Sequence, residues 1–246
     1  HCTPYPKVVE GAAEALKANG GCGVPTIKPW DMDTIREKFA LVQESEPFAI
    51  AMDIDAAGLP FLQGLTPPAG SKSVEELKQI VSWAQRPFIL KGIMTAKGAE
   101  KAVKAGAKAI IVSNHGGRVL DQCPATAEVL PEIVEAVKGQ TKIFIDGGIR
   151  FGIDVFKALA MGADACLICR PVLISYYGGG QEGIECYLDK IREELVDAMY
   201  MFDAALRNTR IEMSPAERRQ FYEKHIRHMT LTIDENGNVS IELKRG

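Results

Sequence analysis

The sequence predicts an α/β fold of the (β/α)8 or TIM-barrel class, and three observations support this prediction. Short apolar runs alternate six times with longer stretches of helical periodicity, as parallel strands joined by crossover helices do. The runs are continuously apolar, which is typical of strands buried on both faces. Glycines and charged residues directly follow the later runs, and barrel enzymes draw their functional residues from the ends of several strands.

Each predicted strand precedes a segment with helical signals. We expect strands at Cys22–Ile27, Phe48–Ile54, Pro87–Lys91, Ala109–Ser113, Lys142–Asp146 and Ala165–Ile168. We expect helices at residues 1–20, Ser73–Trp83, Ala96–Ala105, Thr126–Lys138, Ile153–Met161 and Gln181–Leu206. Ser73 and Glu76 have capping-box spacing, and Gly106 is a natural helix end. The alternative is an open doubly wound sheet, but a dinucleotide-binding G-x-G-x-x-G after a strand and a Walker motif are both absent.

The domain prediction divides the chain near residue 210. Six strands are visible and a barrel has eight, so we expect residues 1–210 to form a barrel whose first two strands precede His1. Residues 211–246 are predicted to be an extension with a charged helix, Ser214–Arg227. A β-hairpin of Met229–Ile233 and Asn238–Leu243 is expected to follow around the turn residues Asn236-Gly237. We interpret this extension as an oligomer contact and expect a homo-oligomer.

Composition argues against several classes of function. The net charge of −3 gives no electrostatic basis for binding nucleic acid or an anionic membrane. No apolar stretch reaches the roughly 18 residues of a membrane span. We interpret the cysteines as reduced core thiols of a cytoplasmic protein; they are Cys2, Cys22, Cys123, Cys166, Cys169 and Cys186. Positions i and i+3 of a strand face opposite sides, so we expect no metal site at Cys166 and Cys169.

His115 is the strongest catalytic candidate. It is the only histidine in the predicted barrel body and directly follows a buried run, and a histidine there can act as a general base near neutral pH. Arg118 lies three residues further on, and its planar guanidinium suits a substrate carboxylate. A structural interpretation also fits both residues, with His115 capping a loop and Arg118 in a surface ion pair.

Charged residues at two other strand ends are further candidates. Lys91 ends an apolar run, where an ammonium can stabilise negative charge on an electron-accepting ring; the alternative is a lysine that extends into solvent. Asp53 and Asp55 share one face of a strand by alternation. Either carboxylate can orient the histidine, or it can cap the following helix.

Two late loops have the composition of a phosphate site. Asp146, Gly147, Gly148 and Arg150 follow the fifth predicted strand. Cys169 and Arg170 follow the sixth. In (β/α)8 barrels the last two loops frequently hold a phosphate with backbone N–H groups at a helix N-terminus. A permanently held flavin nucleotide explains both loops better than a transient substrate does; tight structural turns are the alternative.

Three segments resemble a known family. They are residues 87–95 (PFILKGIMT), 111–118 (IVSNHGGR) and 146–159 (DGGIRFGIDVFKAL). In this order they resemble the FMN-dependent α-hydroxy-acid dehydrogenases, a group that includes glycolate oxidase and lactate oxidase. The resemblance is close over residues 85–205 and looser over 20–60, and it is nearest to a compact bacterial branch of the family.

The resemblance implies an FMN enzyme that oxidises a small 2-hydroxy acid to a 2-oxo acid and passes electrons to an unidentified acceptor. It implies that His115 is the base, Asp55 its acidic partner and Arg118 the carboxylate-binding residue. Lys91 is expected beside the flavin N1–C2 edge, and Ser113 is expected to contact the flavin. The implied phosphate-binding residues are Gly147, Gly148, Arg150 and Arg170.

The sequence departs from the family pattern at three places. Asp53 stands where the family has threonine, the segment Ala56–Leu59 stands where a second carboxylate-binding arginine is expected, and Cys169 replaces a glycine beside the phosphate. Two alternatives therefore stay open. One is another FMN- or phosphate-binding barrel, such as type 2 isopentenyl-diphosphate isomerase, although such barrels lack the His-Gly-Gly-Arg motif. The other is a non-catalytic, truncated barrel.

Overall fold

The structure is a computed structural model that describes residues 6–59, 62, 64, 66–137, 139–208, 229–233 and 239–243. It divides into two compact units between Gly147 and Gly148. The predicted boundary at residue 210 and the predicted helix Ser214–Arg227 lie outside the described residues, so the predicted domain division stays a prediction.

The described part of the first unit contains parallel strands that pair in sequence order. They are β1 (Thr26–Ile27), β2 (Ile50–Asp53), β3 (Phe88–Ile93), β4 (Ala109–Val112) and β5 (Lys142–Ile145). Every residue of β2 and β4 is buried, as the continuous apolar runs predicted. The first strand is shorter than expected, because the turn that precedes it continues to Gly23, whose N–H donates to the Gly21 carbonyl at 2.7 Å.

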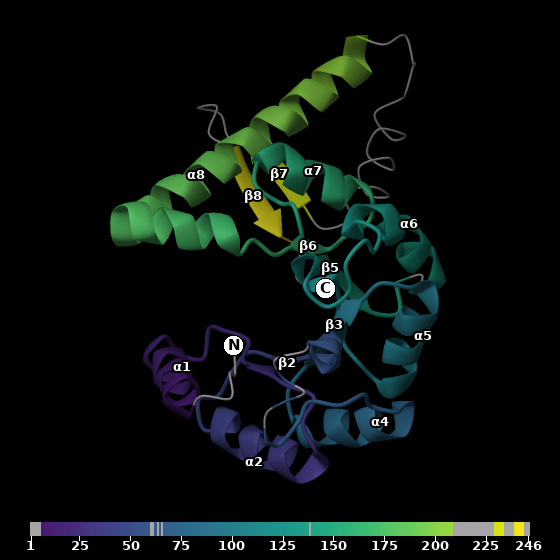
Figure 1. Cartoon of the computed structure of the whole chain (residues 1–246). Coiled ribbons are helices and arrows are strands. Elements are labelled where there is room, and N and C mark those ends of the chain that lie inside the picture. The colour runs from purple at the N-terminus through teal and green to yellow at the C-terminus, as the bar shows by residue number, and fades with distance from the viewer. Residues whose placement is uncertain are drawn as a thin grey trace. The chain divides into compact units, whose positions relative to one another are not determined.

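Helices lie along the outer side of these strands (Figure 1). The helices of this unit are α1 (Pro6–Ala18), α2 (Met32–Gln43), α4 (Val74–Trp83), α5 (Ala96–Ala105) and α6 (Thr126–Val137), with short 3₁₀ helices η1 (Ile54–Gly58) and η2 (His115–Gly117). Helix α5 has the predicted bounds, and Gly106 ends it with a left-handed backbone. Helix α2 follows the first strand, as the alternation predicted, but its bounds were not predicted; Asp31 caps it, and Ile35, Phe39 and Val42 are buried.

The predicted capping box at α4 is confirmed. The Ser73 hydroxyl accepts from the Glu76 N–H at 3.2 Å, and the Glu76 carboxylate accepts from the Ser73 N–H at 2.7 Å. We expect Ser73→Ala to lower the free energy of unfolding by about 1 kcal/mol, because one helix-end N–H loses its acceptor. Urea denaturation measures this loss. The control is Ser82→Ala, whose hydroxyl bonds only a carbonyl of its own helix; an equal loss in both variants would contradict the capping role.

The second unit is built on two packed helices. Its elements are α7 (Gly152–Ala160), β6 (Ala165–Cys166), α8 (Arg170–Asn208), β7 (Met229–Ile233) and β8 (Val239–Leu243). The Phe156 ring of α7 lies 5.4 Å from the Phe202 ring of α8, centroid to centroid. Strands β7 and β8 pair antiparallel as predicted, and the predicted turn residues Asn236 and Gly237 lie outside the described residues. Helix α8 is interrupted at Gly179 and Gly180, whose backbone is non-helical, so its second part begins at Gln181 as predicted. Its first part, from Arg170, was not predicted.

Within the described ranges, no helix is both long and apolar enough to cross a membrane. The described cysteines are free thiols, but the core interpretation is wrong for Cys22, Cys169 and Cys186, which are exposed. Cys169 lies in the loop before α8, and Cys186 lies on an exposed part of that helix. Burial raises the pKa of the Cys166 thiol to about 11.

Candidate active site

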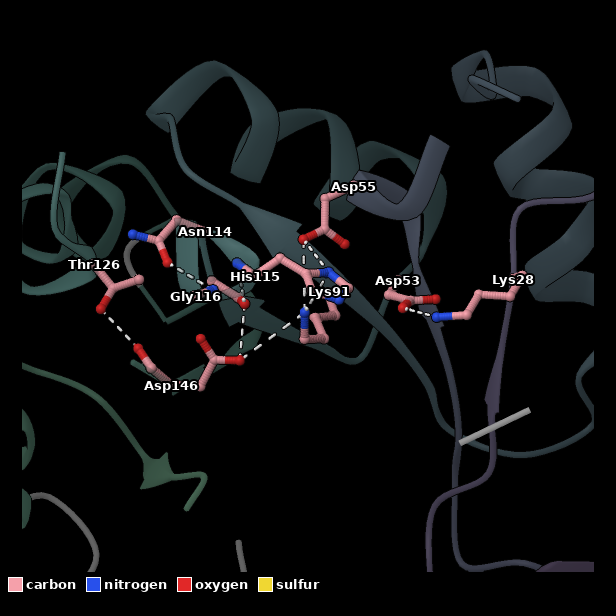
Figure 2. Close-up of polar contacts among 10 residues, drawn as sticks. Lys28, Asp53, Asp55, Lys91, Asn114, His115, Gly116, Thr126 and Asp146 are labelled. Carbon is pink, nitrogen blue, oxygen red and sulfur yellow. Dashed lines mark hydrogen bonds and ion pairs between the residues drawn. The ribbon is translucent and has the colours of Figure 1, made fainter. Parts of the chain in front are cut away.

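Charged and polar side chains gather where the strands of the first unit end (Figure 2). They are Lys28 after β1, Asp53 and Asp55 at the end of β2, Lys91 in β3, His115 after β4 and Asp146 after β5. The carboxyl ends of parallel strands meet at one edge of a sheet, so residues far apart in the sequence meet there. Asp53 and Lys91 are direct partners in the register of β2 and β3.

His115 and Asp55 form the centre of this cluster. His115 Nδ1 lies 2.9 Å from Asp55 Oδ2, and their side chains are 7% and 10% exposed. Lys91 Nζ lies 3.6 Å from the same carboxylate oxygen and 3.4 Å from Nδ1. A carboxylate at Nδ1 favours the tautomer whose Nδ1–H it accepts. This arrangement leaves His115 Nε2 as the nitrogen that can take up a proton.

The backbone at His115 is held in an uncommon conformation. Its φ is +57°, and Gly116 and Gly117 follow with φ of +67° and +76°. Asn114 Oδ1 accepts from the Gly116 N–H at 3.1 Å and braces this turn. A non-glycine residue with a left-handed backbone costs conformational free energy, and such strained residues are common at functional sites. The turn directs the imidazole toward Asp55, on a segment 60 residues earlier.

Ser113 and Asp146 hold the His115 turn in place through hydrogen bonds. The buried Ser113 hydroxyl donates to Asp146 Oδ2 at 2.8 Å and accepts from the His115 N–H at 3.2 Å. Thr126 Oγ1 donates to the Asp146 carbonyl at 2.7 Å. Burial raises the pKa of the Asp146 carboxyl, and the Ser113 hydrogen bond and the Lys91 charge oppose that rise. Ser113 therefore braces the cluster; its predicted contact with a flavin stays a prediction.

Sequence reasoning missed Lys28, which forms a buried ion pair with Asp53. Burial raises the pKa of the Asp53 carboxyl, and the charge and hydrogen bond of Lys28 oppose that rise. A usable signal was present, because Lys28 follows an apolar run as Lys91 does. The partner, 25 residues away, is chosen by strand pairing rather than by local sequence.

The cluster does not have the charge balance of a metal site. Asp53, Asp55 and His115 each offer one ligand atom, and these atoms lie within 4.8 Å of one another. The ammonium groups of Lys28 and Lys91 already pair with the two carboxylates. A divalent cation placed among them would be repelled by both lysines, so we do not interpret these residues as metal ligands.

The Arg118 side chain is not part of the charged cluster around His115. It is exposed, and in the described part of the chain its guanidinium forms no ion pair. The next residue, Val119, packs on the buried residues Ala56 and Leu59. The segment that lacks the family's second arginine therefore anchors the loop that carries Arg118, and the predicted contact of Arg118 with a substrate carboxylate stays a prediction.

The remaining predicted phosphate residues lie on either side of the unit boundary. Gly147 and Gly148 are exposed with φ of +90° and +80°. Arg150 and Arg170 are exposed in the second unit, and Cys169 directly precedes α8. Their predicted convergence on a phosphate stays a prediction.

The structure refines which helix N-terminus is available to an anion. The Asp154 carboxylate accepts from the N–H groups of Arg150 and Phe151 at 3.0 Å each. Glu194 accepts from the Gly152 N–H at 2.8 Å. These carboxylates occupy the start of α7, whereas α8 has a cation, Arg170, at its first residue.

Comparison with known proteins identifies the family. A profile of FMN-dependent dehydrogenases matches residues 47–204, more than half of the chain. The chain is 47% identical to an L-lactate oxidase from Nostoc over 139 residues, which is 56% of this chain and 37% of the relative. It is 46% identical to human 2-hydroxyacid oxidase 1 over 129 residues, which is 52% of this chain and 35% of the relative.

Solved structures agree with this likeness. A mandelate oxidase variant with (S)-mandelic acid matches with a TM-score of 0.69 and 32% identity, over 76% of this chain and 61% of that one. A lactate oxidase from Pediococcus acidilactici matches with a TM-score of 0.70 and 31% identity, over 76% and 59% of the two chains. The chain belongs to the FMN-dependent dehydrogenase family. The predicted TIM-barrel fold class is confirmed, and the chain spans about a third of the length of its curated relatives.

Proposed function

We propose that the intact protein binds FMN and oxidises a small 2-hydroxy acid to the corresponding 2-oxo acid. The observation that carries this proposal is the 2.9 Å contact of His115 with Asp55, with Lys91 beside both. These residues stand in the motifs that the family shares. FMN is the cofactor of that family, and it supplies a two-electron acceptor when bound.

The polar groups of the first unit fit a flavin. Asp53, Asp55 and Asp146 each retain one buried carboxylate oxygen that has no hydrogen-bond donor among the described residues. FMN brings a ring N–H and ribityl hydroxyls, which are donors of this kind. The Lys91 ammonium suits a ring that gains negative charge on reduction. The exposed positive-φ backbone at Gly147 allows close approach of a ligand.

The roles of the side chains follow from their contacts. His115 Nε2 accepts the proton of the substrate hydroxyl or α-carbon, because Asp55 engages Nδ1. Asp55 then faces an imidazolium, which its negative charge stabilises. Arg118 binds the substrate carboxylate with its planar fork. Ser113 and Asp146 hold the turn that carries the base.

The substrate class rests on the relatives. Those reported above are named for lactate, 2-hydroxy acids and mandelate, all with a hydroxyl next to a carboxylate. Without the second arginine, the substrate carboxylate depends on Arg118, and we expect weaker discrimination among small 2-hydroxy acids. A cytoplasmic location and a homo-oligomeric assembly stay predictions of the sequence.

An absorption experiment tests the proposal. The intact protein is reconstituted with FMN, and its visible spectrum is followed during anaerobic titration with a panel of 2-hydroxy acids. We expect a yellow protein whose flavin band is bleached by at least one of them. A protein that binds no FMN would overturn the proposal, and bound FMN that no 2-hydroxy acid bleaches would favour another flavin barrel. Reoxidation by oxygen, a quinone or an electron-transfer protein then identifies the acceptor.

A further inference from the structure

The Lys28–Asp53 pair has no part in the proposed reaction, although it lies beside the proposed base. Lys28 is 6% exposed and Asp53 is fully buried. A carboxylate atom of Asp53 lies within 4.8 Å of ligand atoms of both Asp55 and His115. Burying two charges is costly even when they pair. A pair kept at such a position therefore suggests a role beyond packing.

The charges that face His115 come from all of the neighbouring strand ends. Among the described residues they are Lys28 after β1, Asp53 and Asp55 from β2 and η1, Lys91 from β3 and Asp146 from β5. With the carboxyl groups ionised, these residues sum to one net negative charge. A protonated imidazole brings the cluster to neutrality, whereas a neutral imidazole leaves it negative.

We propose that Lys28 and Asp53 are positioning residues whose opposite charges cancel at the His115 ring, so that loss of either one alone shifts the proton affinity of that ring. Asp53 is a second acidic neighbour of the ring, and the Lys28 ammonium offsets the field of its carboxylate. At separations below 5 Å in a partly buried site, one charge changes a protonation equilibrium by about tenfold or more. The inference rests on the proposed function only in taking His115 as the base.

The test is an NMR pH titration of the histidine rings in the intact, flavin-free protein. Asp53→Asn removes one negative charge, so His115 is expected to lose its proton at a lower pH, with a tenfold or larger fall in its protonation constant. Lys28→Met/Asp53→Asn restores the original charge count, and the titration is expected to return near that of the wild type. His115→Asn identifies the resonance by its absence.

The double variant separates an electrostatic role from a structural one. If the pair only supports packing, removing both partners disturbs the ring at least as much as removing one. No shift in Asp53→Asn, or no recovery in the double variant, would overturn the proposal. Glu75→Gln, which removes an exposed carboxylate of α4, is the control and is expected to leave the titration unchanged.

An unpaired buried lysine can prevent Asp53→Asn from folding. In that case Lys28→Met replaces it and is compared with the same double variant. Its expected shift has the opposite sign, to higher pH, because a negative charge is left unopposed. The titration uses neither flavin nor substrate. A protein that shows these shifts but binds no FMN would refute the proposed function and retain this inference. A protein that binds FMN and is bleached by a 2-hydroxy acid but shows no such shifts would refute this inference and retain the proposed function.

Discussion

Replacing His115 by alanine is expected to lower turnover of a 2-hydroxy acid by about 10²- to 10⁴-fold while FMN stays bound. The imidazole is the group in the cluster placed to accept a proton, since Asp55 holds its Nδ1 and leaves Nε2 as an acceptor. Anaerobic stopped-flow absorption measures the rate of flavin reduction, and titration with FMN measures cofactor affinity.

A second variant removes the ambiguity that arises from the backbone. His115 has φ of +57°, where alanine is strained and asparagine is tolerated. His115→Asn offers Asp55 an amide N–H but cannot accept the proton, so it is expected to be as slow as the alanine variant. His225→Ala changes a histidine of the segment predicted from the sequence to be a C-terminal extension and serves as the control. Turnover at the wild-type rate in His115→Asn would refute the assignment of the base.

Gly92→Ala is expected to damage both stability and activity. Gly92 has φ of +99°, and a Cβ there would lie 2.5 Å from Asp55 Cβ and 2.6 Å from Asp55 Cγ. Asp55 must move, and its hydrogen bond to His115 is then lost. We expect a loss of roughly 2–3 kcal/mol in the free energy of unfolding and a fall in turnover of at least tenfold. Denaturant unfolding and steady-state kinetics measure the two effects.

Gly106→Ala is the matched control for this prediction. Gly106 has a similar φ of +90°, but the nearest atom to an added Cβ is Val81 Cγ1 at 3.5 Å, an ordinary contact. This variant therefore carries the backbone penalty of about 1 kcal/mol without the collision. Its turnover is expected to match the wild type. Equal behaviour of the two variants would show that contact with Asp55 is not what requires glycine at position 92.

The alternation of apolar runs and helical segments predicted most of the fold. Helix α5 was predicted with its bounds, because Thr95 and Gly106 are strong local end signals. A helix start at Gln181 was predicted because three consecutive glycines, Gly178–Gly180, are typical of a break, and Gly179 and Gly180 do have non-helical backbone. The helical segment before them, from Arg170, was missed.

The site was predictable where a residue follows a strand. His115, Asp55 and Lys91 were predicted on that ground and lie together. The Lys28–Asp53 pair was not, because it depends on the register of β1 against β2, which places the two strand ends side by side. The direction of an exposed side chain such as Arg118 depends on solvent and ligand rather than on packing.

The spacing of the cluster along the chain has a consequence for folding. Asp55 and His115 are 60 residues apart, Ser113 and Asp146 are 33 apart, and Lys28 and Asp53 are 25 apart. Contacts of such long range form only after loop-closure entropy has been overcome. A folding intermediate that holds helices but not the paired strands has no assembled base. Recovery of the His115 environment during refolding therefore reports the pairing of strands far apart in the sequence, and not the formation of helices alone.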